Sequence, residues 1–320
     1  MAGRHVASCH IAIAVCTAQR PRMLRRCLES LVRLRLLPGM AVEIIVVENE
    51  PTPKCADIVA SVAARSPHPI RYVIEPQRGI PFARNRAIEE CITGPCEWIA
   101  LIDDDEAAAA DWLVTLYVAC LEHNADVATG PVRQIYETPP PHWWKPQRSE
   151  RRMTGDLMHE ASTNNVLFSA RIVRSDGMCI RFNPRLTYGS EDIDFFRCAH
   201  RQGAKIIWVE DAWVEEEVPA SRVRPKRLLS RLVMASSSGT LNVVIRDGFW
   251  TAFSRFVPKA LRRIVVGFSA VAAGALIIPF CRLHGEKIFF YGVTRLMKAI
   301  GNIRGLLNIG HHYYDAIDGR

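Results

Sequence analysis

The sequence has no CxxC pair, no Walker P-loop and no GxGxxG loop. Its ten cysteines are irregularly spaced, and several stand inside apolar runs, where cysteine behaves as a small hydrophobic residue. These absences argue against a disulfide scaffold, a structural zinc site, a P-loop NTPase and classical dinucleotide binding. They also favour a reducing compartment.

A secretory leader and internal repeats are missing as well. The first apolar run, residues 11–16, has six residues and continues into Thr17-Ala18-Gln19-Arg20, which does not have the composition of a cleavage region. No repeat with a period of about 20 to 50 residues is found. We therefore expect the main body of the protein to stay in the cytosol.

Acidic residues are scarce at one end of the chain. The 320 residues include 41 Lys and Arg against 33 Asp and Glu, a net charge of +8. Residues 221–320 have 16 basic and 4 acidic residues, whereas residues 1–220 have 25 basic and 29 acidic residues. A basic excess points to nucleic acid or to an anionic membrane as the partner. Its confinement to one end favours the membrane and argues against nucleic acid.

Short apolar runs alternate with helical stretches between residues 10 and 130. Residues 21–37 have apolar positions at helical spacing, begin at Pro21 and stop at Pro38-Gly39. The runs are rich in Val and Ile, as strands buried on both faces are, and they lie at residues 10–16, 42–47, 70–74 and 98–102. This alternation predicts an α/β fold with a parallel sheet, whose ligands bind at the carboxyl ends of the strands.

Beyond residue 222 the chain is expected to be helical and basic, with residues 9–222 and 223–320 as two units. Residues 264–280 contain no charge and are flanked by basic residues: Lys259, Arg262, Arg263, Arg282 and Lys287. Seventeen residues are the lower limit for crossing a hydrocarbon core of about 30 Å, so one short span, a re-entrant or interfacial helix and a buried core helix stay open. We favour association with the membrane surface, because the flanking cations suit anionic headgroups.

Four consecutive acids, Asp103 to Glu106, follow the predicted strand at 98–102. Carboxylates this close repel one another, so something must offset their charge. In an extended chain Asp103 and Asp105 point to the same side, which suits Mg²⁺ or Mn²⁺ held together with substrate phosphates. In the alternative, these acids are solvated or cap the helix that begins near Asp111.

A second acidic motif, Gly189-Ser190-Glu191-Asp192, opens a predicted helix near residues 190–203. Ser190 as N-cap with two acids in the first turn is a sufficient structural explanation. Asp192, however, shares a helix face with the apolar residues Phe195 and Phe196. A carboxylate on that inward face would be partly removed from water, which suits a general base.

Weaker patterns complete the set. Thr17 and Arg20 follow the first predicted strand and Glu48 follows the second, positions that would ring a nucleotide but are also typical of turns and caps. Arg84 and Asn85 lie in a helical segment after Gly79, an arrangement compatible with a diphosphate. Trp143 and Trp144, in a proline-rich loop, would stack on an acceptor sugar or form a rigid aromatic lid or core.

Taken in order, these segments resemble the inverting family 2 glycosyltransferases of the GT-A fold, especially the bacterial exopolysaccharide type related to succinoglycan glucosyltransferases. The resemblance covers about residues 9–245. The motifs that support it are Ala14-Val-Cys-Thr-Ala-Gln-Arg-Pro, Ile45-Val-Val-Glu-Asn, Arg78-Gly-Ile-Pro-Phe-Ala-Arg-Asn, Ile102-Asp-Asp-Asp-Glu, Thr129-Gly-Pro, Asn164-Asn-Val-Leu, Glu191-Asp-Ile-Asp-Phe-Phe and Val218-Pro-Ala-Ser-Arg.

The resemblance implies a nucleotide-diphosphate sugar donor, expected to be a UDP-sugar, and Mn²⁺ or Mg²⁺ as cofactor. It places Asp103 near the ribose and Asp105 on the metal, and it makes Asp192 the catalytic base for the acceptor hydroxyl. The remaining roles that it implies are nucleotide contacts for Thr17, Arg20, Glu48, Arg84 and Asn85, and acceptor contacts for Asn165 and Glu191 beside Trp143 and Trp144.

The sequence departs from the family pattern at three places. Glu48 stands where many relatives have Asp, and Glu215-Glu216-Glu217 replaces a frequent His; Glu216 is either a further metal or diphosphate group or part of a solvated run. The Gln-x-x-Arg-Trp motif of processive synthases is missing, so we expect transfer of a single sugar.

The expected acceptor is a lipid-linked saccharide at the cytoplasmic side of the cell membrane. Two alternatives stay open at this point. One is a sugar-nucleotide nucleotidyltransferase, although Thr17-Ala-Gln-Arg-Pro lacks the glycine-rich triphosphate loop of that class. The other is a non-catalytic, membrane-bound module that binds sugar nucleotides.

Overall fold

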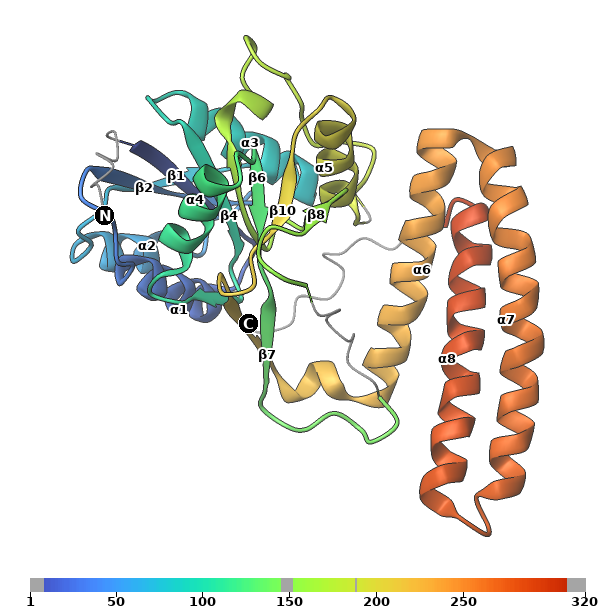
Figure 1. Cartoon of the computed structure of the whole chain (residues 1–320). Helices are drawn as coiled ribbons and strands as arrows, with labels where there is room; N and C mark the ends of the chain where they lie inside the picture. The colour runs from blue at the N-terminus through green and yellow to red at the C-terminus, as the bar shows by residue number, and fades with distance from the viewer. Residues whose placement is uncertain (1–8, 145–151, 188, 310–320) are drawn as a thin grey trace.

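A computed structural model describes residues 9–144, 152–187 and 189–309 of the chain. Its N-terminal part is built on an eight-stranded sheet in the order β3-β2-β1-β4-β9-β6-β10-β8 (Figure 1). The strands are β1 (Cys9–Thr17), β2 (Met40–Glu48), β3 (Ile70–Ile74), β4 (Trp98–Asp103), β6 (Val127–Thr129), β8 (Leu157–Met158), β9 (Asn165–Ser169) and β10 (Ile206–Trp208). The predicted α/β fold is confirmed.

Helices cover both faces of this sheet. Ile11, Ile13 and Val15 of β1 pack under α1 (Pro21–Val32), α2 (Ala56–Ala63) and α4 (Trp112–Glu122). Ala12 and Ala14 face α3 (Ile80–Ile92) and α5 (Glu191–Arg201) on the opposite side. Residues 11–15 of β1 are therefore all withdrawn from water, which explains the continuous apolar run in this part of the sequence.

Not all strand pairs are parallel. β1, β2, β3 and β4 are mutually parallel, as expected, but β9 lies antiparallel between β4 and β6, and β8 pairs antiparallel with β10. A second sheet of three strands, β5 (Glu106–Ala108), β11 (Val214–Val218) and β7 (Val132–Tyr136), was not predicted. Its strands are short and rich in charged or polar residues, so they lack the apolar runs that mark the main sheet.

Helix α1 is shorter than the predicted 21–37. Leu24, Leu28 and Leu31 are fully buried, as their spacing requires, but the helix ends at Val32. Past that point the backbone turns, and the amide of Arg35 donates to the carbonyl of Ala110 at 2.8 Å. A tertiary hydrogen bond thus ends the helix before Pro38 does.

The Thr129-Gly130-Pro131 motif has a steric explanation. A Cβ on Gly130 would lie 2.0 Å from the carbonyl oxygen of Ala212. Only glycine permits this close approach of two backbones where β6 ends.

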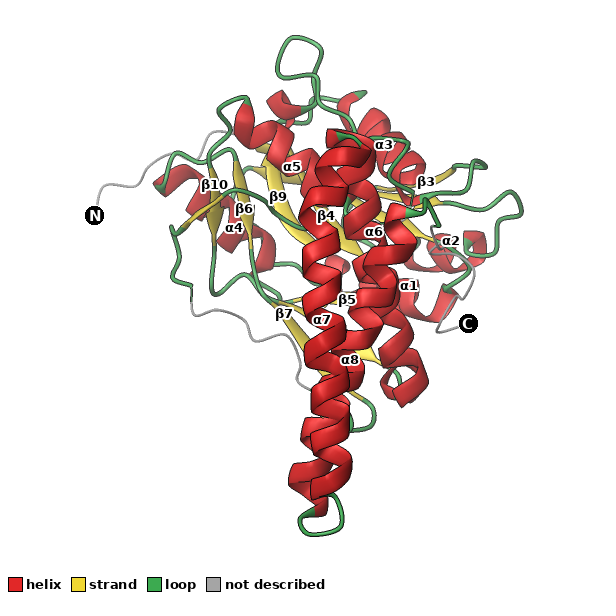
Figure 2. Ribbon diagram, turned by 90° about the vertical axis from the view of Figure 1, so that its right-hand side faces the viewer, coloured by secondary structure: helices red, strands yellow, loops and turns green. Residues whose placement is uncertain are grey.

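The C-terminal part forms a layer of three long helices beside the sheet: α6 (Pro225–Asp247), α7 (Phe249–Ile277) and α8 (Arg282–Leu306). The short 3-10 helix η2 (Ala220–Val223) leads into α6. Figure 2 shows the three helices in front of the sheet, with α7 and α8 extending below it to the turn that joins them. The uncharged run at 264–280 forms the second half of α7 and this turn.

Two helices of the described chain, α6 and α7, are long and apolar enough to cross a membrane. The sequence predicted one such segment. Most of the apolar part of α7 is exposed on the surface of the protein, whereas α6 packs more of its apolar side chains inward.

Candidate active site

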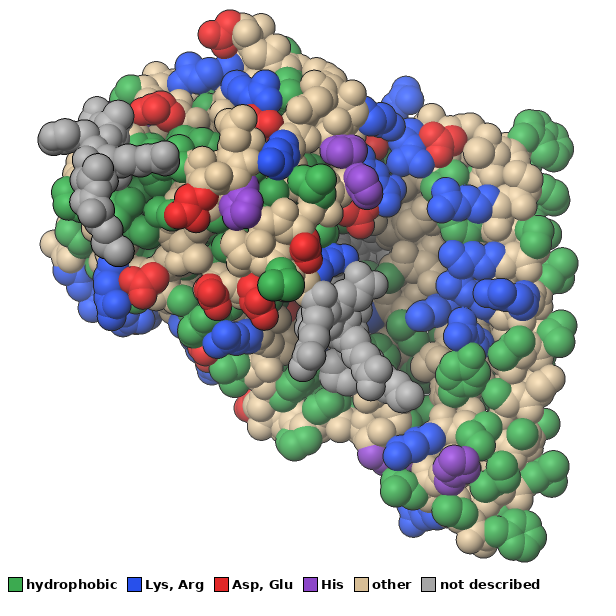
Figure 3. All heavy atoms as spheres, viewed as in Figure 1, with side chains coloured by type: hydrophobic (Ala, Val, Ile, Leu, Met, Phe, Trp, Pro, Cys, Tyr) green, Lys and Arg blue, Asp and Glu red, His purple; other side chains and the backbone are tan. Residues whose placement is uncertain are grey.

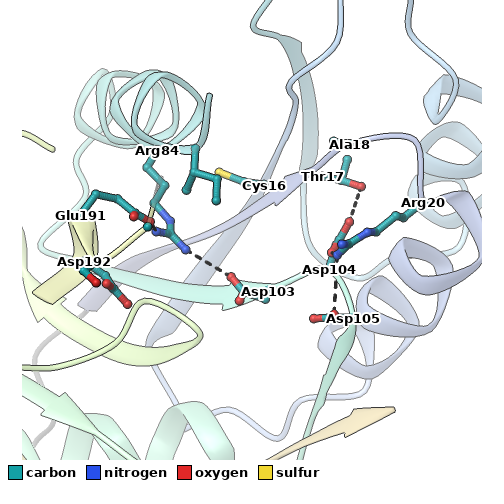
Figure 4. Close-up of a pocket in the computed structure, with 13 residues that line it drawn as sticks. Cys16, Thr17, Ala18, Arg20, Arg84, Asp103, Asp104, Asp105, Glu191 and Asp192 are labelled. Carbon is teal, nitrogen blue, oxygen red and sulfur yellow. Dashed lines mark hydrogen bonds and ion pairs between the residues drawn. The ribbon is translucent and has the colours of Figure 1, made fainter. Parts of the chain in front are cut away.

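A pocket of about 260 Å³ opens where β1 and β4 end and α5 begins. Figure 4 shows the side chains that line it, which come from segments far apart in the sequence. Residues that the sequence analysis singled out make up most of the polar lining: Thr17, Arg20, Arg84, Asp103, Asp105, Glu191 and Asp192. The carboxyl ends of parallel strands meet at this edge, as the sheet topology requires.

Asp104 joins the loops after β1 and β4. The Thr17 hydroxyl donates to its Oδ2 at 2.6 Å, and Arg20 Nη1 donates to its Oδ1 at 3.1 Å. Burial raises the pKa of Asp104 to about 6, although Arg20 and the hydrogen bonds act in the opposite direction. The sequence analysis gave Asp104 no role, yet in an extended chain it points opposite to Asp103 and Asp105, toward the neighbouring β1 loop.

Asp105 is held by two arginines. Arg222 Nη2 lies 2.8 Å from its Oδ2, and Arg20 Nη1 lies 3.6 Å from the same atom. Arg222 also donates to Glu216 Oε1 at 3.0 Å, and Glu216 in turn accepts from Gln134 at 3.0 Å. The structure thus places Glu216 next to Asp105 through a shared cation, outside the lining of the pocket.

Arg222 had been quoted within the Val218–Arg222 motif without a function. It lies in η2, far in sequence from Asp105, and its side chain is 9% exposed. Burial lowers its pKa, but the carboxylate of Asp105 outweighs that effect and the pKa is raised. Only the fold shows that Arg222 pairs with Asp105 at the end of β4.

Asp103 and Glu191 share Arg84. Arg84 forms a short hydrogen bond with Glu191 and lies 3.6 Å from Asp103 Oδ1. Burial raises the pKa of Glu191, and that of Asp103 to about 7, partly against the effect of Arg84. The Asp103 side chain keeps 44% of its surface exposed, so water in the open pocket moderates the shift.

Asp192 faces the same pocket from the first turn of α5 (Figure 4). Its Oδ1 accepts from the amide of Ile193 at 2.8 Å. Phe195 and Phe196 are buried beneath it, as the predicted helix face requires. The expected N-cap role of Ser190 is wrong. This residue has φ +65°, and its side chain makes no capping hydrogen bond with the described residues.

Glu48 and Asn85, both predicted as nucleotide contacts, lie outside the pocket lining. The carboxylate of Glu48 is fully buried and accepts from the amides of Lys54 and Cys55 at 3.0 Å. Asn85 exchanges two hydrogen bonds with the backbone of Phe182, at 2.8 and 2.9 Å. Both side chains hold the loops around the pocket in place.

The expected acceptor contact of Asn165 does not fit its position. Its side chain is 1% exposed, accepts from Trp112 Nε1 at 2.7 Å and donates to the carbonyls of Pro131 and Ala212 at 3.0 and 2.8 Å. These bonds tie β9 to the segments after β6 and β10. The amide is therefore a buried scaffold group, and sequence alone does not distinguish such a group from a ligand contact.

The two tryptophans lie against the helical layer. The Trp143 ring stacks on Phe290 of α8, with 4.2 Å between ring centroids and 9° between planes. Trp144 meets Trp143 edge to face at 6.2 Å. Sugar stacking and packing were both open for this pair. The arrangement favours packing for Trp143, because Phe290 already covers one face of its ring.

The model of the family "Glycosyl transferase family 2" matches residues 12–182. The succinoglycan biosynthesis protein ExoM of Rhizobium meliloti (strain 1021) is 31% identical over 311 residues, which cover 91% of this chain and 98% of the relative. The chain belongs to glycosyl transferase family 2. This glycosyltransferase is thus an enzyme of the predicted class, and the nucleotidyltransferase and non-catalytic alternatives are set aside.

Solved structures agree with this glycosyltransferase in fold. The mannosyltransferase PcManGT from Pyrobaculum calidifontis, in complex with GDP-Man and Mn²⁺, has a TM-score of 0.59 at 15% identity and covers 93% of this chain and 87% of its own. S. aureus TarS 1-349 in complex with UDP has a TM-score of 0.53 at 15% identity, with 97% and 95% covered. The glycosyltransferase therefore has the predicted GT-A fold.

Among the residues that the structure describes, no group of three or more His, Cys, Asp or Glu side chains has the geometry of a metal site. Mg²⁺ and Mn²⁺ at phosphate-transfer sites usually use only one or two carboxylates and take their other ligands from water and phosphates. Asp103 and Asp105, both in the pocket lining, match that number of carboxylates.

Proposed function

We propose that this glycosyltransferase transfers one sugar from a nucleotide-diphosphate sugar, expected to be a UDP-sugar, to a lipid-linked saccharide in exopolysaccharide synthesis. The observation that supports it most is the pocket itself, where predicted donor residues and the predicted base meet. The proposal draws on ExoM for the pathway, and on TarS, solved with UDP and with UDP-GlcNAc, for the donor class.

The donor side of the proposal rests on charge. Arg20 and Arg84 flank the acidic residues at the end of β4 and line the pocket. Guanidinium groups pair with phosphate oxygens through two hydrogen bonds, so these arginines suit a diphosphate. Asp103, with 44% of its side chain exposed to the pocket, is placed to accept from ribose hydroxyls.

A divalent cation, Mn²⁺ or Mg²⁺, fits the acidic end of β4. The raised pKa of Asp103 reflects its burial and the negative charge of Asp105 and Asp104, which a cation would offset. Asp105 would hold the metal next to the donor phosphates, with Glu216 adjacent through Arg222. When bound, the metal stabilises the charge that develops on the leaving diphosphate.

Asp192 is the proposed base. It takes the proton of an acceptor hydroxyl while that oxygen bonds to the anomeric carbon, and the bond from this carbon to the diphosphate breaks with its electron pair on the leaving group. Attack opposite the leaving group inverts the anomeric centre. Asp192 lies across the pocket from Asp105, as such an in-line arrangement requires (Figure 4).

We assign residues 9–222 to catalysis and residues 223–320 to attachment at the cytoplasmic face of the membrane; residues 310–320 lie outside the described part. A membrane-attached acceptor agrees with the long apolar helices α6 and α7. Asn242 of α6 donates to the carbonyl of Gly189 at the pocket edge, at 2.7 Å, so the helical layer reaches the acceptor side.

The test compares Asp192→Asn with Asp194→Asn, which removes an acid from the same helical turn but outside the pocket. With UDP- and GDP-sugars, Mn²⁺ and a membrane extract as acceptor source, release of nucleoside diphosphate by Asp192→Asn should fall about 10²- to 10⁴-fold. Asp194→Asn should stay within about threefold of the wild type.

Thermal stabilisation by the donor separates binding from chemistry. Asp192→Asn should keep the wild-type donor-dependent shift while losing turnover. Undiminished turnover would remove Asp192 as the base, and the absence of stabilisation by every nucleotide sugar would overturn the donor assignment.

A further inference from the structure

Helices α7 and α8 border an open cavity of about 190 Å³, which is lined by Arg262, Arg263, Val266, Tyr291 and Arg295. It lies outside the active-site pocket, with which it shares no residue. Three guanidinium groups around one small space would repel one another, so the cavity suits a multivalent anion.

Within the part of the chain that the structure describes, the cations around this cavity have no acidic partners. Lys259 and Lys298 extend the group formed by the three arginines, and none of the five forms a salt bridge within the described residues. Helix α7 contains no acid, and the one acid of α8, Glu286, pairs with Arg282 and His142 at the other end of that helix. A phosphate would neutralise charge that the protein leaves uncompensated.

The electrostatic effect extends to the lysines. Burial lowers the pKa of Lys259, and the neighbouring Arg263, Arg255 and Arg262 lower it further. Burial likewise lowers the pKa of Lys298, together with Arg263 and Arg295. Among the described residues, Arg263 donates to two neutral acceptors, the carbonyl of Lys298 at 3.3 Å and the side chain of Asn302.

An exposed apolar stripe runs along α7 beside these cations. Its members recur three, four or eight residues apart on one helix face: Trp250, Phe253, Leu261, Val265, Phe268 and Leu276. The stripe continues to Phe280 at the turn, which is 91% exposed. Figure 3 shows Lys and Arg side chains gathered over this helical layer and hydrophobic ones along its outer edge and lower end.

The length of the stripe indicates how the helices meet a bilayer. Trp250 and Leu276 mark opposite ends of α7, so insertion of the turn alone would leave Trp250 and Phe253 uncovered. A helix with apolar and basic faces side by side lies in the plane of the interface, with its cations at headgroup depth.

Building on the membrane association proposed above, we propose that the cavity of Arg262, Arg263 and Arg295 is a phosphate site for anionic phospholipid headgroups, and that it docks α7 lengthwise on the bilayer. Tyr291 completes the site: its hydroxyl accepts from Arg295 at 2.9 Å, and the guanidinium lies 4.8 Å from its ring centroid. This contact orients Arg295 toward the shared cavity.

The test uses the full chain with Arg262→Gln, Arg263→Gln and Arg295→Gln combined. The matched control combines Arg33→Gln, Arg35→Gln and Arg65→Gln, which removes the same charge from exposed positions near α1 and α2. Flotation is measured with vesicles of phosphatidylcholine alone and with 30% phosphatidylglycerol. Circular dichroism and the donor-dependent thermal shift confirm that each variant is folded.

The cavity variant should bind the phosphatidylglycerol vesicles about 100-fold more weakly than the wild type, since each cation at the headgroups contributes about tenfold or less. The control should bind like the wild type. Equal losses in both variants, or no loss in either, would overturn the site. If inorganic phosphate or soluble RNA at equal charge concentration displaced the protein from these vesicles, the membrane headgroup would not be the occupant of the cavity.

A second experiment tests membrane association independently of the phosphate site. Leu261→Ser with Phe268→Ser should reduce binding to both kinds of vesicle, because the apolar contribution does not depend on headgroup charge. If the wild type floats with neither vesicle, the membrane association proposed for the enzyme fails. If the serine variant loses binding and the arginine variant does not, the membrane association stands and the phosphate site is wrong.

Discussion

Asp103, Asp104 and Asp105 follow one another in the chain, yet each meets a different partner. Asp104 turns to Thr17 and Arg20, Asp105 to Arg222, and Asp103 to Arg84. Three carboxylates at the end of one strand are tolerated because arginines from three other segments balance them. In the proposed function, a divalent cation that binds with the donor would take over part of the charge balance that these arginines provide.

Asp103 makes the stability of the enzyme depend on pH. Its folded pKa of about 7 lies above the ordinary value of 3.8, so the folded state binds more protons than the unfolded state between these limits. Charged Asp103 therefore lowers the free energy of unfolding most above pH 7. This loss of stability declines as the pH falls from 7 to 4 and disappears below pH 4.

We expect Asp103→Asn to stabilise the donor-free enzyme by about 1 kcal/mol at pH 8, a value discounted strongly for the exposure of this side chain. The gain should shrink toward zero at pH 4. Urea unfolding at pH 8, 6 and 4 measures it, with Asp194→Asn as control. A gain that is the same at every pH would contradict the assignment.

At the scale of elements, α8 is shaped by small residues on the faces that meet α6 and α7. Gly285, Gly292 and Ala299 recur every seven residues. A Cβ on Gly292 would lie 2.5 Å from the carbonyl oxygen of Gly267 and 2.7 Å from the amide of Val271. The backbones of α7 and α8 thus touch directly, and a side chain cannot be added without moving one of them.

Gly292→Ala should therefore destabilise the protein by about 1 to 3 kcal/mol, although alanine is the better helix former. Gly239→Ala is the matched control within α6, since a Cβ there meets nothing within 4 Å. That variant should be neutral or more stable by up to about 1 kcal/mol. Thermal unfolding of both proteins decides; equal behaviour would show that α7 and α8 are not closely packed.

For the molecule as a whole, the loop after β7 connects the catalytic part to the helical layer. Trp143 stacks on Phe290, and His142 Nε2 lies 3.0 Å from Glu286 of the same helix. On the other side of the pocket, Asn242 of α6 binds Gly189. The layer is thus tied to the catalytic part both at the loop after β7 and at the pocket edge.

Trp143→Ala should lower the free energy of unfolding by about 1 to 2 kcal/mol, from lost apolar contact and ring stacking. Trp144→Ala should cost less, because the Trp144 ring meets Trp143 edge to face at 6.2 Å and is not stacked on it. Thermal unfolding and tryptic digestion measure the change, while the KM for the acceptor should stay constant. An increased KM with unchanged stability would instead make Trp143 an acceptor contact.

Local patterns were sufficient to predict β1, β2, β3 and β4, and to bring the acids after β4 and Asp192 to one edge of the sheet. Each depends on nearest neighbours in the chain: apolar runs make buried strands, and charges directly after them reach the sheet edge. Asn165 and Arg222 show where such patterns fail. An amide in an apolar strand looks the same whether it binds a ligand or three buried backbone and indole groups, and the arginine acts on an acid more than a hundred residues away.

The sequence by itself determined the α/β fold, the family and the concentration of positive charge at one end, because these follow from periodicity, motif order and composition. The tertiary structure decided which acids face which arginines and that the apolar run at 264–280 belongs to a longer helix. It also decided that five cations converge with no salt bridge among the described residues. Pairing between distant segments is set by packing and charge balance in three dimensions, and neither is encoded in local spacing.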